Sequence, residues 1–191
     1  MKMIDLIFAT TNEYKLKIAN RALRDYEVTL TSLPELKTDI LEIQSDSQEE
    51  VAVDKAGKYF NILKRPLVSM DSGLFIEGLN GFPGVYTKYI LDTLGLDGIM
   101  HLMKYADTRK AYTQRTVAFI DGNSIKTFVS RCDGTLLPQK RDENQLGYDS
   151  VFLVDGTSKT LSEMSDNERG EALGESWRQL GTWLQKEYSG G

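Results

Sequence analysis

The sequence predicts an α/β fold, one body with a β-hairpin lobe, on three observations. Short apolar runs alternate with segments that carry apolar residues at helical spacing. Two alternating segments flank an Asp-Gly-Asn turn, which is the pattern of a β-hairpin. No sequence repeat or low-complexity linker divides the 191 residues, so we expect a single domain over residues 1–191.

The first part of the chain alternates predicted strands and helices. Apolar runs predict strands over residues 4–9, 27–31 and 67–70. Helical spacing of apolar residues predicts a helix over 14–26. Ser47-Gln48-Glu49-Glu50 has the pattern of a capping box, so a second helix is expected to begin there and to extend to Leu63.

The second part predicts short helices and the hairpin. Helices are expected over 86–93 and 97–105, and hairpin strands over 112–120 and 124–132. A further strand is expected over 150–154. A second capping box, at residues 165–168, is expected to open the last helix, whose inward-facing residues are Leu173, Trp177, Leu180 and Leu184.

Composition excludes several classes of function. The net charge of −5 and the pI near 5.0 argue against nucleic acid and anionic membranes as partners. The chain has one histidine, His101, and one cysteine, Cys132, which disfavours histidine triads, zinc sites and thiol clusters. No apolar run approaches the roughly 20 residues of a membrane span, and Met1-Lys2-Met3 leads into a strand rather than a signal peptide, so we expect a cytoplasmic protein.

Two turns carry the residue types that remain for chemistry. Thr10, Asn12 and Lys15 follow the first strand and offer a hydroxyl, an amide and a lysine at a helix start, all groups that bind anions. Asp71-Ser72-Gly73 follows a predicted strand end and offers a carboxylate for a metal ion or a water molecule. An ordinary helix cap and a plain turn are the alternatives. Ligands of α/β sheets favour the crevice at the strand carboxyl ends, where both turns are expected.

Three other charged residues are candidates for the site only in combination with these turns. Glu42 precedes the capped helix and can join Asp71 around a hard cation. Lys55 within that helix and Lys88 after a Gly/Pro-rich loop can add positive charge. Each of the three, taken alone, is more often a solvated surface residue.

Six motifs, in order and spacing over nearly the whole chain, carry a family resemblance. The chain resembles the inosine triphosphatase family of purine nucleoside triphosphate pyrophosphatases. This resemblance implies an elongated body with a mixed twisted sheet flanked by helices, and two lobes with a central active-site cleft. It also implies metal-dependent hydrolysis between the α- and β-phosphates, giving monophosphate and pyrophosphate. The motifs are Ala9–Lys15, Glu42–Gln44, Asp71–Leu74, Gly81–Tyr86, Gly147–Asp149 and Glu163–Ser165.

The resemblance also implies roles for individual residues. Glu42 and Asp71 would bind Mg²⁺, and Asp71 would orient or deprotonate the attacking water, directly or through the metal. Relatives commonly form homodimers through the central lobe, and we expect one here. The residues implied to hold the nucleoside triphosphate at its phosphate end are Thr10, Asn12, Lys15, Lys55, Ser72 and Lys88.

The end of the site that contacts the base departs from the family pattern. Relatives usually carry an aromatic residue where this chain has Leu146, before Gly147, and a lysine where it has Arg169. Their Ser-His-Arg segment, which recognises the 6-keto oxygen of inosine and xanthosine, falls near Glu175. Tyr148 can still stack on a base and Asp149 can accept from a ring N–H, whereas Glu175 would accept from an amino group.

The departure leaves three alternatives open. The enzyme acts on inosine- and xanthosine-type nucleotides, with the last helix shifted by a residue and Arg178 supplying the missing charge. In the second alternative, the enzyme prefers a different base, such as a modified pyrimidine. In the third, the protein binds nucleotides with little turnover, although Lys15, Glu42 and Asp71 are retained. The related Maf-like pyrophosphatases are disfavoured by the Gly81–Tyr86 loop.

Overall fold

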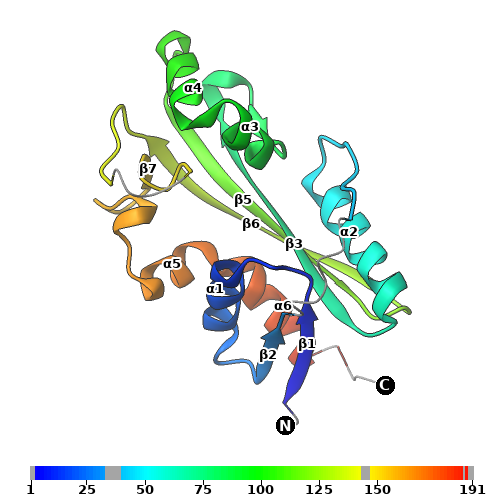
Figure 1. Ribbon diagram of the computed structural model, residues 1–191. Helices are drawn as coiled ribbons and strands as arrows, with labels where there is room; N and C mark the ends of the chain where they lie inside the picture. The colour runs from blue at the N-terminus through cyan, green and yellow to red at the C-terminus, as the bar shows by residue number, and fades with distance from the viewer. Residues whose placement is uncertain (1–2, 33–39, 143–146, 187, 189–191) are drawn as a thin grey trace. The chain divides into compact units, whose positions relative to one another are not determined.

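The structure is a computed structural model that describes residues 3–32, 40–142, 147–186 and 188 (Figure 1). In chain order the elements are β1 (Ile4–Phe8), α1 (Glu13–Leu23), β2 (Val28–Thr31), α2 (Gln48–Leu63), β3 (Leu67–Ile76), a 3-10 turn (Glu77–Leu79), β4 (Pro83–Gly84), α3 (Thr87–Thr93), α4 (Gly95–Leu102), a 3-10 turn (Met103–Tyr105), β5 (Lys110–Ile120), β6 (Ile125–Leu136), β7 (Phe152–Val154), a 3-10 turn (Leu161–Glu163), α5 (Asp166–Leu173) and α6 (Glu175–Lys186).

The strands form one mixed seven-stranded sheet. Their order is β2-β1-β3-β5-β6-β7, with β4 paired to β3. β1 is parallel to both β2 and β3, while β3 pairs with β4, and β6 with β7, in antiparallel fashion. The predicted α/β class with a mixed sheet flanked by helices is therefore confirmed, as is the adjacency of the two hairpin strands.

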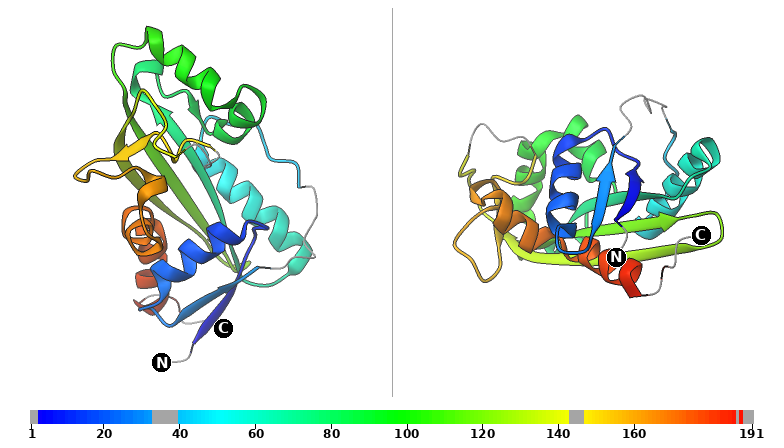
Figure 2. Two further views of the ribbon diagram at one scale, coloured as in Figure 1. Left: turned by 60° about the vertical axis from the view of Figure 1, so that its left-hand side comes forward. Right: turned by 90° about the horizontal axis from the view of Figure 1, so that it is seen from below.

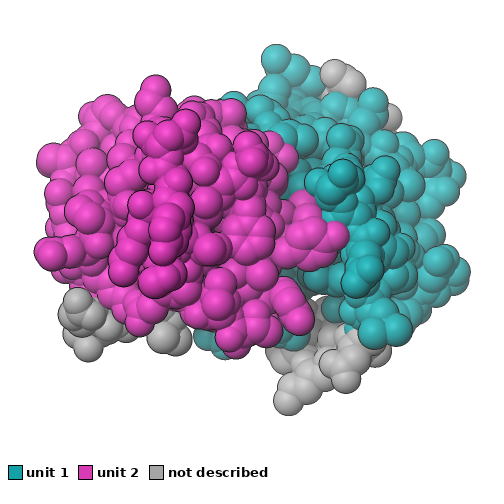
Figure 3. Space-filling view, turned by 90° about the horizontal axis from the view of Figure 1, so that it is seen from above, with its two compact units in different colours: residues 1–71, 115–130, 173–191 teal, residues 72–114, 131–172 magenta. Residues whose placement is uncertain are grey.

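The chain divides into two compact units, coloured separately in Figure 3. Unit 1 comprises residues 1–71, 115–130 and 173–191, and unit 2 comprises residues 72–114 and 131–172. The chain passes from one unit to the other within β3, β5, β6 and α5. The single domain and the central cleft stay predictions. Among the described residues, no helix is long and apolar enough to cross a membrane.

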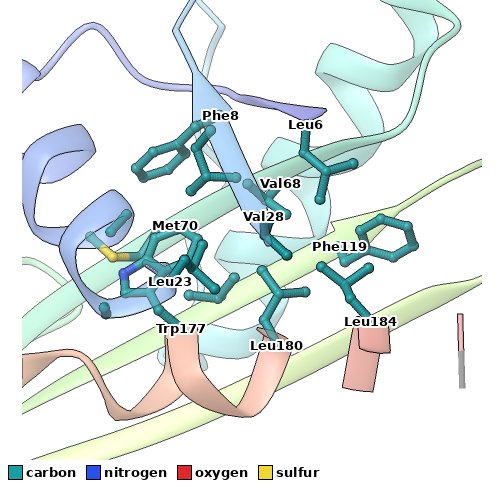
Figure 4. Close-up of a cluster of buried hydrophobic side chains, with 14 residues drawn as sticks. Leu6, Phe8, Leu23, Val28, Val68, Met70, Phe119, Trp177, Leu180 and Leu184 are labelled. Atoms are coloured by element: carbon teal, nitrogen blue, oxygen red, sulfur yellow. The ribbon is translucent and has the colours of Figure 1, made fainter. Parts of the chain in front are cut away.

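Unit 1 buries apolar side chains on both faces of its strands. On one face, α1 and α6 pack over residues such as Phe8 and Phe119, and the ring of Trp177 meets Phe8 edge-on at 4.9 Å (Figure 4). On the other face, α2 contributes Ala52 and Ala56 to a second cluster. Figure 2 shows α1 running alongside β1 and β2. The two clusters fix the strands whose ends carry the candidate site.

The predicted turn at Asp71-Ser72-Gly73 is wrong, because β3 continues through it to Ile76. The residues after the glycine are apolar, and Leu74 and Ile76 are fully buried. They gain a strand partner ten residues further along the chain, since Leu74 lies opposite Gly84 of β4. This pairing extends the strand beyond the point where a local turn signal ends it.

The predicted last helix is in fact two helices, which meet at Gly174. The capping box at Ser165 is complete: its backbone N–H donates to Glu168 at 2.8 Å, and its hydroxyl accepts from the N–H of Glu168 at 3.4 Å. It opens α5 rather than the whole segment. The carbonyl of Gly174 then accepts from the N–H groups of Trp177 and Arg178, which starts α6.

Other boundaries differ in detail. The hairpin strands are longer than predicted, and the strand expected over 150–154 is shortened to β7 because residues 148–151 form a turn. Ser47 caps α2 by accepting from the N–H of Glu50 at 3.2 Å. The capping box is only half formed, since the Glu50 carboxylate accepts instead from the hydroxyl of Ser45 at 2.7 Å.

Candidate active site

The turn between β1 and α1 fixes the first lysine of the site. The N–H of Ala9 donates to the carbonyl of Val68 at 2.8 Å, which ties the turn to β3. Thr10 Oγ1 accepts from the N–H of Asn12 at 3.1 Å, and Asn12 Oδ1 accepts from the N–H of Lys15 at 3.0 Å. Asn12 is therefore the N-cap of α1, and Lys15 lies in the first turn of the helix. The contact of these side chains with phosphate stays a prediction.

Asp71 lies at the same edge of the sheet as this turn. β1 and β3 are parallel neighbours with Phe8 opposite Val68, so the residues that follow each emerge together. Ser69 points toward α2, because its hydroxyl donates to the carbonyl of Ala52 at 2.6 Å. Side chains alternate along a strand, so Asp71, two residues later, faces the α2 side as well.

An ion pair lies on the α2 side of the sheet. The ammonium of Lys55, on α2, is 2.8 Å from Glu42 Oε1. The Lys55 side chain is 22% exposed and that of Glu42 is 52% exposed, so the pair is open to solvent on the carboxylate side. The structure thus brings together two residues that the sequence alone left as separate surface charges.

Electrostatics shows that Lys15 lies among these charges. Burial, together with the positive charges of Lys55 and Arg115, lowers the pKa of its ammonium from 10.5 to about 8, while Asp71 and Glu42 oppose the change. We call these five residues the charge cluster. All of them belong to unit 1.

Asp71 is shifted toward its neutral form too. Burial raises the pKa of its carboxyl, and Glu42 adds to the rise, while Lys15, the amide of Gln48 and Lys55 lower it. Its Oδ2 atom is buried and has no hydrogen-bond partner among the described residues. A buried carboxylate oxygen without a partner has lone pairs that can accept a hydrogen bond or bind a cation.

The donor set of the charge cluster fits a magnesium ion. Among the described residues, no group of three or more acidic, histidine or cysteine side chains could hold a metal ion by itself. Mg²⁺ is usually bound by one or two carboxylates together with water and substrate phosphates. Glu42 and Asp71 provide two carboxylates, and the unpartnered Oδ2 of Asp71 provides a free acceptor.

Of the predicted base-contacting residues, Gly147, Tyr148, Asp149 and Arg169 lie in unit 2, whereas Glu175 lies in unit 1. Leu146 lies outside the described residues. Gly147 has a φ of 78°, a left-handed conformation that favours glycine, and it precedes the half-buried Tyr148. The hydroxyl of Tyr148 is 3.1 Å from Thr113 Oγ1. This contact fixes the phenol end of the ring, and the predicted stacking on a base stays a prediction.

Asp149 and Arg169 form an ion pair within unit 2. The guanidinium Nη1 atom of Arg169 is 3.3 Å from Asp149 Oδ2, and the Arg169 side chain is 9% exposed. A buried arginine with a carboxylate partner holds that carboxylate in place. The two residues implied for base recognition therefore act on one another in the protein without ligand.

The remaining predicted residues are at separate places. Ser72 lies within β3. Lys88 is exposed at the start of α3 and pairs with Asp92 one turn later. Glu175 is the first residue of α6, and its carboxylate accepts from Nε of Arg178 at 3.0 Å. Arg178 thus neutralises Glu175, and the substrate contacts of Ser72, Lys88 and Glu175 stay predictions.

Comparison with known proteins decides the family. A sequence profile of the Ham1 family matches residues 6–173, most of the chain. The chain belongs to the Ham1 family. The resemblance drawn from six motifs is thereby confirmed.

Relatives of this Ham1-family chain span its full length. It is 32% identical over 183 residues to a dITP/XTP pyrophosphatase of Hyperthermus butylicus, with 95% of each chain covered. It is 35% identical over 182 residues to a dITP/XTP pyrophosphatase of Korarchaeum cryptofilum, covering 95% of this chain and 96% of the relative. A solved HAM1 protein of Coxiella burnetii matches its fold with a TM-score of 0.82 at 25% identity, covering 95% of this chain and 98% of that one.

Sequence reasoning missed two residues of the candidate site. Arg115 lies on β5, where it alternates in phase with the buried Val117 and Phe119. Gln48 occupies the first position of α2, four residues before the buried Ala52. In both cases the signal was a polar residue in phase with apolar positions that face the core.

Proposed function

We propose that this protein hydrolyses purine nucleoside triphosphates of the inosine and xanthosine type to nucleoside monophosphate and pyrophosphate. The observation that carries the proposal is the match, over 95% of both chains, to a protein named dITP/XTP pyrophosphatase. The charge cluster supports it, because an acidic protein needs converging cations to accept a triphosphate.

The charge cluster supplies what the reaction requires. A triphosphate carries close to four negative charges, and Lys15, Lys55 and Arg115 offer three positive ones. Glu42 and Asp71 would hold Mg²⁺, which when bound neutralises phosphate charge and polarises the phosphate oxygens. Thr10 and Asn12, at the start of α1, place N–H groups and a helix N-terminus beside the phosphates.

Asp71 is the proposed catalytic residue. Water adds to phosphorus, the bridging bond between the α- and β-phosphates breaks, and one proton of the water is released. The carboxylate of Asp71 orients this water or accepts its proton, because it is a buried base with an unpartnered oxygen. Lys15 stabilises the negative charge that develops on the phosphate oxygens.

Base recognition is proposed for Tyr148 and Asp149, with contributions from Leu146, Gly147, Arg169 and Glu175. Arg169 holds Asp149, and this pair distinguishes the chain from the lysine-containing pattern of the family. A shifted preference, for modified pyrimidines or other bases, is the second candidate function. It is favoured by the ion pair between Glu175 and Arg178. In this pair the positive charge of Arg178, which would otherwise contact a 6-keto oxygen, is already engaged by Glu175.

The partners follow from the same proposal. We propose a cytoplasmic homodimer that does not bind nucleic acid. Unit 2 exposes several large apolar side chains, which a second copy would cover. They are Phe82, Tyr86, Tyr89, Leu94, Leu102 and Tyr105. Sedimentation at micromolar concentration should give twice the mass of the 21.5 kDa chain, and a single-chain mass would contradict the dimer.

The proposed activity is tested by product analysis with Mg²⁺. Purified protein is incubated with dITP, ITP, XTP, the four ordinary triphosphates and modified pyrimidine triphosphates, and pyrophosphate and phosphate are measured separately. Pyrophosphate from dITP and XTP in preference to the others is the expected result. Release of phosphate alone would contradict cleavage between the α- and β-phosphates, and preference for pyrimidines would select the second candidate.

A neutral variant separates an enzyme from a binding protein. Asp71→Asn keeps the shape of the side chain and removes its charge. Pyrophosphate release should fall by about 10²- to 10⁴-fold, the usual contribution of a general base. Asp25→Asn, on an exposed side chain of unit 1, is the control and should leave turnover unchanged. Unchanged turnover in Asp71→Asn would overturn the catalytic role.

A further inference from the structure

Gln48 is a polar residue on the apolar face of α2. The buried residues of this helix include Val51, Ala52, Ala56 and Tyr59, and Gln48 is 3% exposed at the start of the same face. Helical spacing therefore turns its side chain inward, toward the strands, rather than to solvent. A buried amide that replaces an apolar side chain requires a reason, because its unmet hydrogen bonds weaken the fold.

One end of the Gln48 amide is held by the sheet. The hydroxyl of Thr116, on β5, donates to Gln48 Oε1 at 3.4 Å, and Thr116 is fully buried. Since the oxygen of the amide faces Thr116, its nitrogen is directed elsewhere. That nitrogen, Nε2, is buried and has no hydrogen-bond partner among the described residues.

The other end of the amide lies beside Asp71. The Gln48 amide is near enough to favour the charged form of the Asp71 carboxyl and so to lower its pKa. Asp71 Oδ2 is the matching atom, a buried acceptor that no described residue satisfies. An unmet donor and an unmet acceptor thus lie next to one another, on the side of β3 where the Ser69 hydroxyl donates to the carbonyl of Ala52.

We infer that Gln48 is a positioning residue, held by Thr116, whose amide nitrogen donates to Asp71 and keeps the carboxylate aimed at the reacting phosphate. The inference rests on the proposed function and adds to it a support for the catalytic carboxylate. The donation from Thr116 to Oε1 leaves Nε2 as the end of the amide that faces Asp71. An amide turned the other way would present its oxygen, whose partial negative charge the carboxylate repels.

Stability separates this role from a purely structural one. If Gln48 served only to hold α2 on the sheet, replacing it would lower the melting temperature. If it supports Asp71 instead, replacing both partners of the Thr116–Gln48 hydrogen bond by apolar side chains of similar shape should be nearly neutral for the fold. The melting temperature of the double variant Gln48→Met with Thr116→Val should then be equal to or above that of the wild type, while turnover falls.

Kinetics of paired variants test the connection. With the best triphosphate substrate, Gln48→Met and Thr116→Val should each lower kcat by about 10- to 100-fold, with KM changed less than about threefold, as for the loss of outer-shell support. Thr116→Ser keeps the hydroxyl and should restore most of kcat. The double variant should be no slower than Gln48→Met, because both changes act through one amide. Ser69→Ala, the matched control, removes a buried bond from β3 to α2 and should leave kcat unchanged.

Two kinetic outcomes would overturn the inference. One is a kcat of Gln48→Met within twofold of the wild type. The other is a double variant whose loss is the product of the two single losses. A fall in kcat together with a fall in melting temperature for the double variant Gln48→Met with Thr116→Val would assign the residue to structure instead.

A crystal structure decides the matter without turnover. In the wild type, Gln48 Nε2 should lie within hydrogen-bond distance of Asp71 Oδ2, with the carboxylate in one rotamer. In Gln48→Met the Asp71 side chain should adopt another rotamer or several. An unchanged Asp71 in the variant would refute the positioning role. If the wild type hydrolyses no triphosphate, the proposed function fails, and this comparison still tests whether Gln48 holds Asp71.

Discussion

The ammonium of Lys15 is the costliest charge of the cluster, and its removal should stabilise the protein. Burial, Lys55 and Arg115 bring its pKa from 10.5 to about 8. At about 1.36 kcal/mol per pKa unit, keeping this lysine charged costs the folded state about 3 kcal/mol. Lys15→Met keeps the length of the side chain and removes the charge. We expect the free energy of unfolding at pH 7 to rise by about 1–3 kcal/mol, since Asp71 loses a compensating charge at the same time.

The gain should depend on pH in a defined direction. Between pH 8 and about 10.5 the folded wild type has released the Lys15 proton, whereas the unfolded chain still binds it. The unfolded state then binds more protons, so wild-type stability rises with pH relative to the variant, and the gap closes across this window. Urea unfolding of both proteins at pH 7, 8, 9 and 10 measures the gap.

Function and stability should move in opposite directions in this variant. Loss of a charged hydrogen bond to phosphate should lower kcat/KM for the triphosphate by about 10- to 100-fold. Lys17→Met, an exposed lysine on the same helix, is the control and should change neither quantity appreciably. Equal stability of wild type and Lys15→Met at pH 7, or a gap that does not narrow toward pH 10, would refute the electrostatic account.

Three further predictions concern the scaffold. Gly181→Ala should lower the free energy of unfolding by about 1–3 kcal/mol, because its Cβ would lie 2.5 Å from Cγ of Tyr26. Gly57→Ala, in the middle of α2 with open space around it, should raise that energy by about 0.5–1 kcal/mol; urea unfolding measures both, and a stable Gly181→Ala would contradict the packing. Hydrogen bonds, first from Lys159 and then from its N-cap serine, lower the pKa of Glu168 to about 2, below its ordinary 4.5. Glu168→Gln should therefore be less stable than the wild type at pH 7, with a difference that fades as the pH falls from 4.5 to 2; a difference independent of pH would contradict the pairing.

Local signals predicted the elements that begin with a cap. The turn from β1 into α1 and the start of α2 were predicted because Asn12 and Ser47 make hydrogen bonds within their own first turns. The run of β3 through Gly73 was not predicted, since it depends on pairing with β4 and β5, which a local turn signal does not show. The break at Gly174 was hidden because apolar spacing continues across it, from Leu173 into α6.

The candidate site was predicted in part for a similar reason. Lys15 follows β1, and Asp71 lies on the neighbouring strand β3, three residues beyond the residue paired with Phe8, so topology brings them together. The pairing of Glu42 with Lys55 could be recognised only from the fold, because no spacing rule connects a loop to the middle of a helix. Gln48 was assigned to a capping box, and only the burial of α2 shows that its amide faces the sheet.

The shifts in the charge cluster explain how an acidic protein can accept a polyanion. In the protein without ligand, the pKa of Lys15 is lowered and that of Asp71 is raised, so each group is moved toward its neutral form. A triphosphate favours the charged lysine, and a bound cation favours the charged carboxylate. Each ligand therefore relieves a cost that the fold bears alone, and binding one prepares the site for the other. A protein with a net charge of −5 thus confines its affinity for phosphate to one sheet edge, where burial makes each lysine count more than it would at the surface.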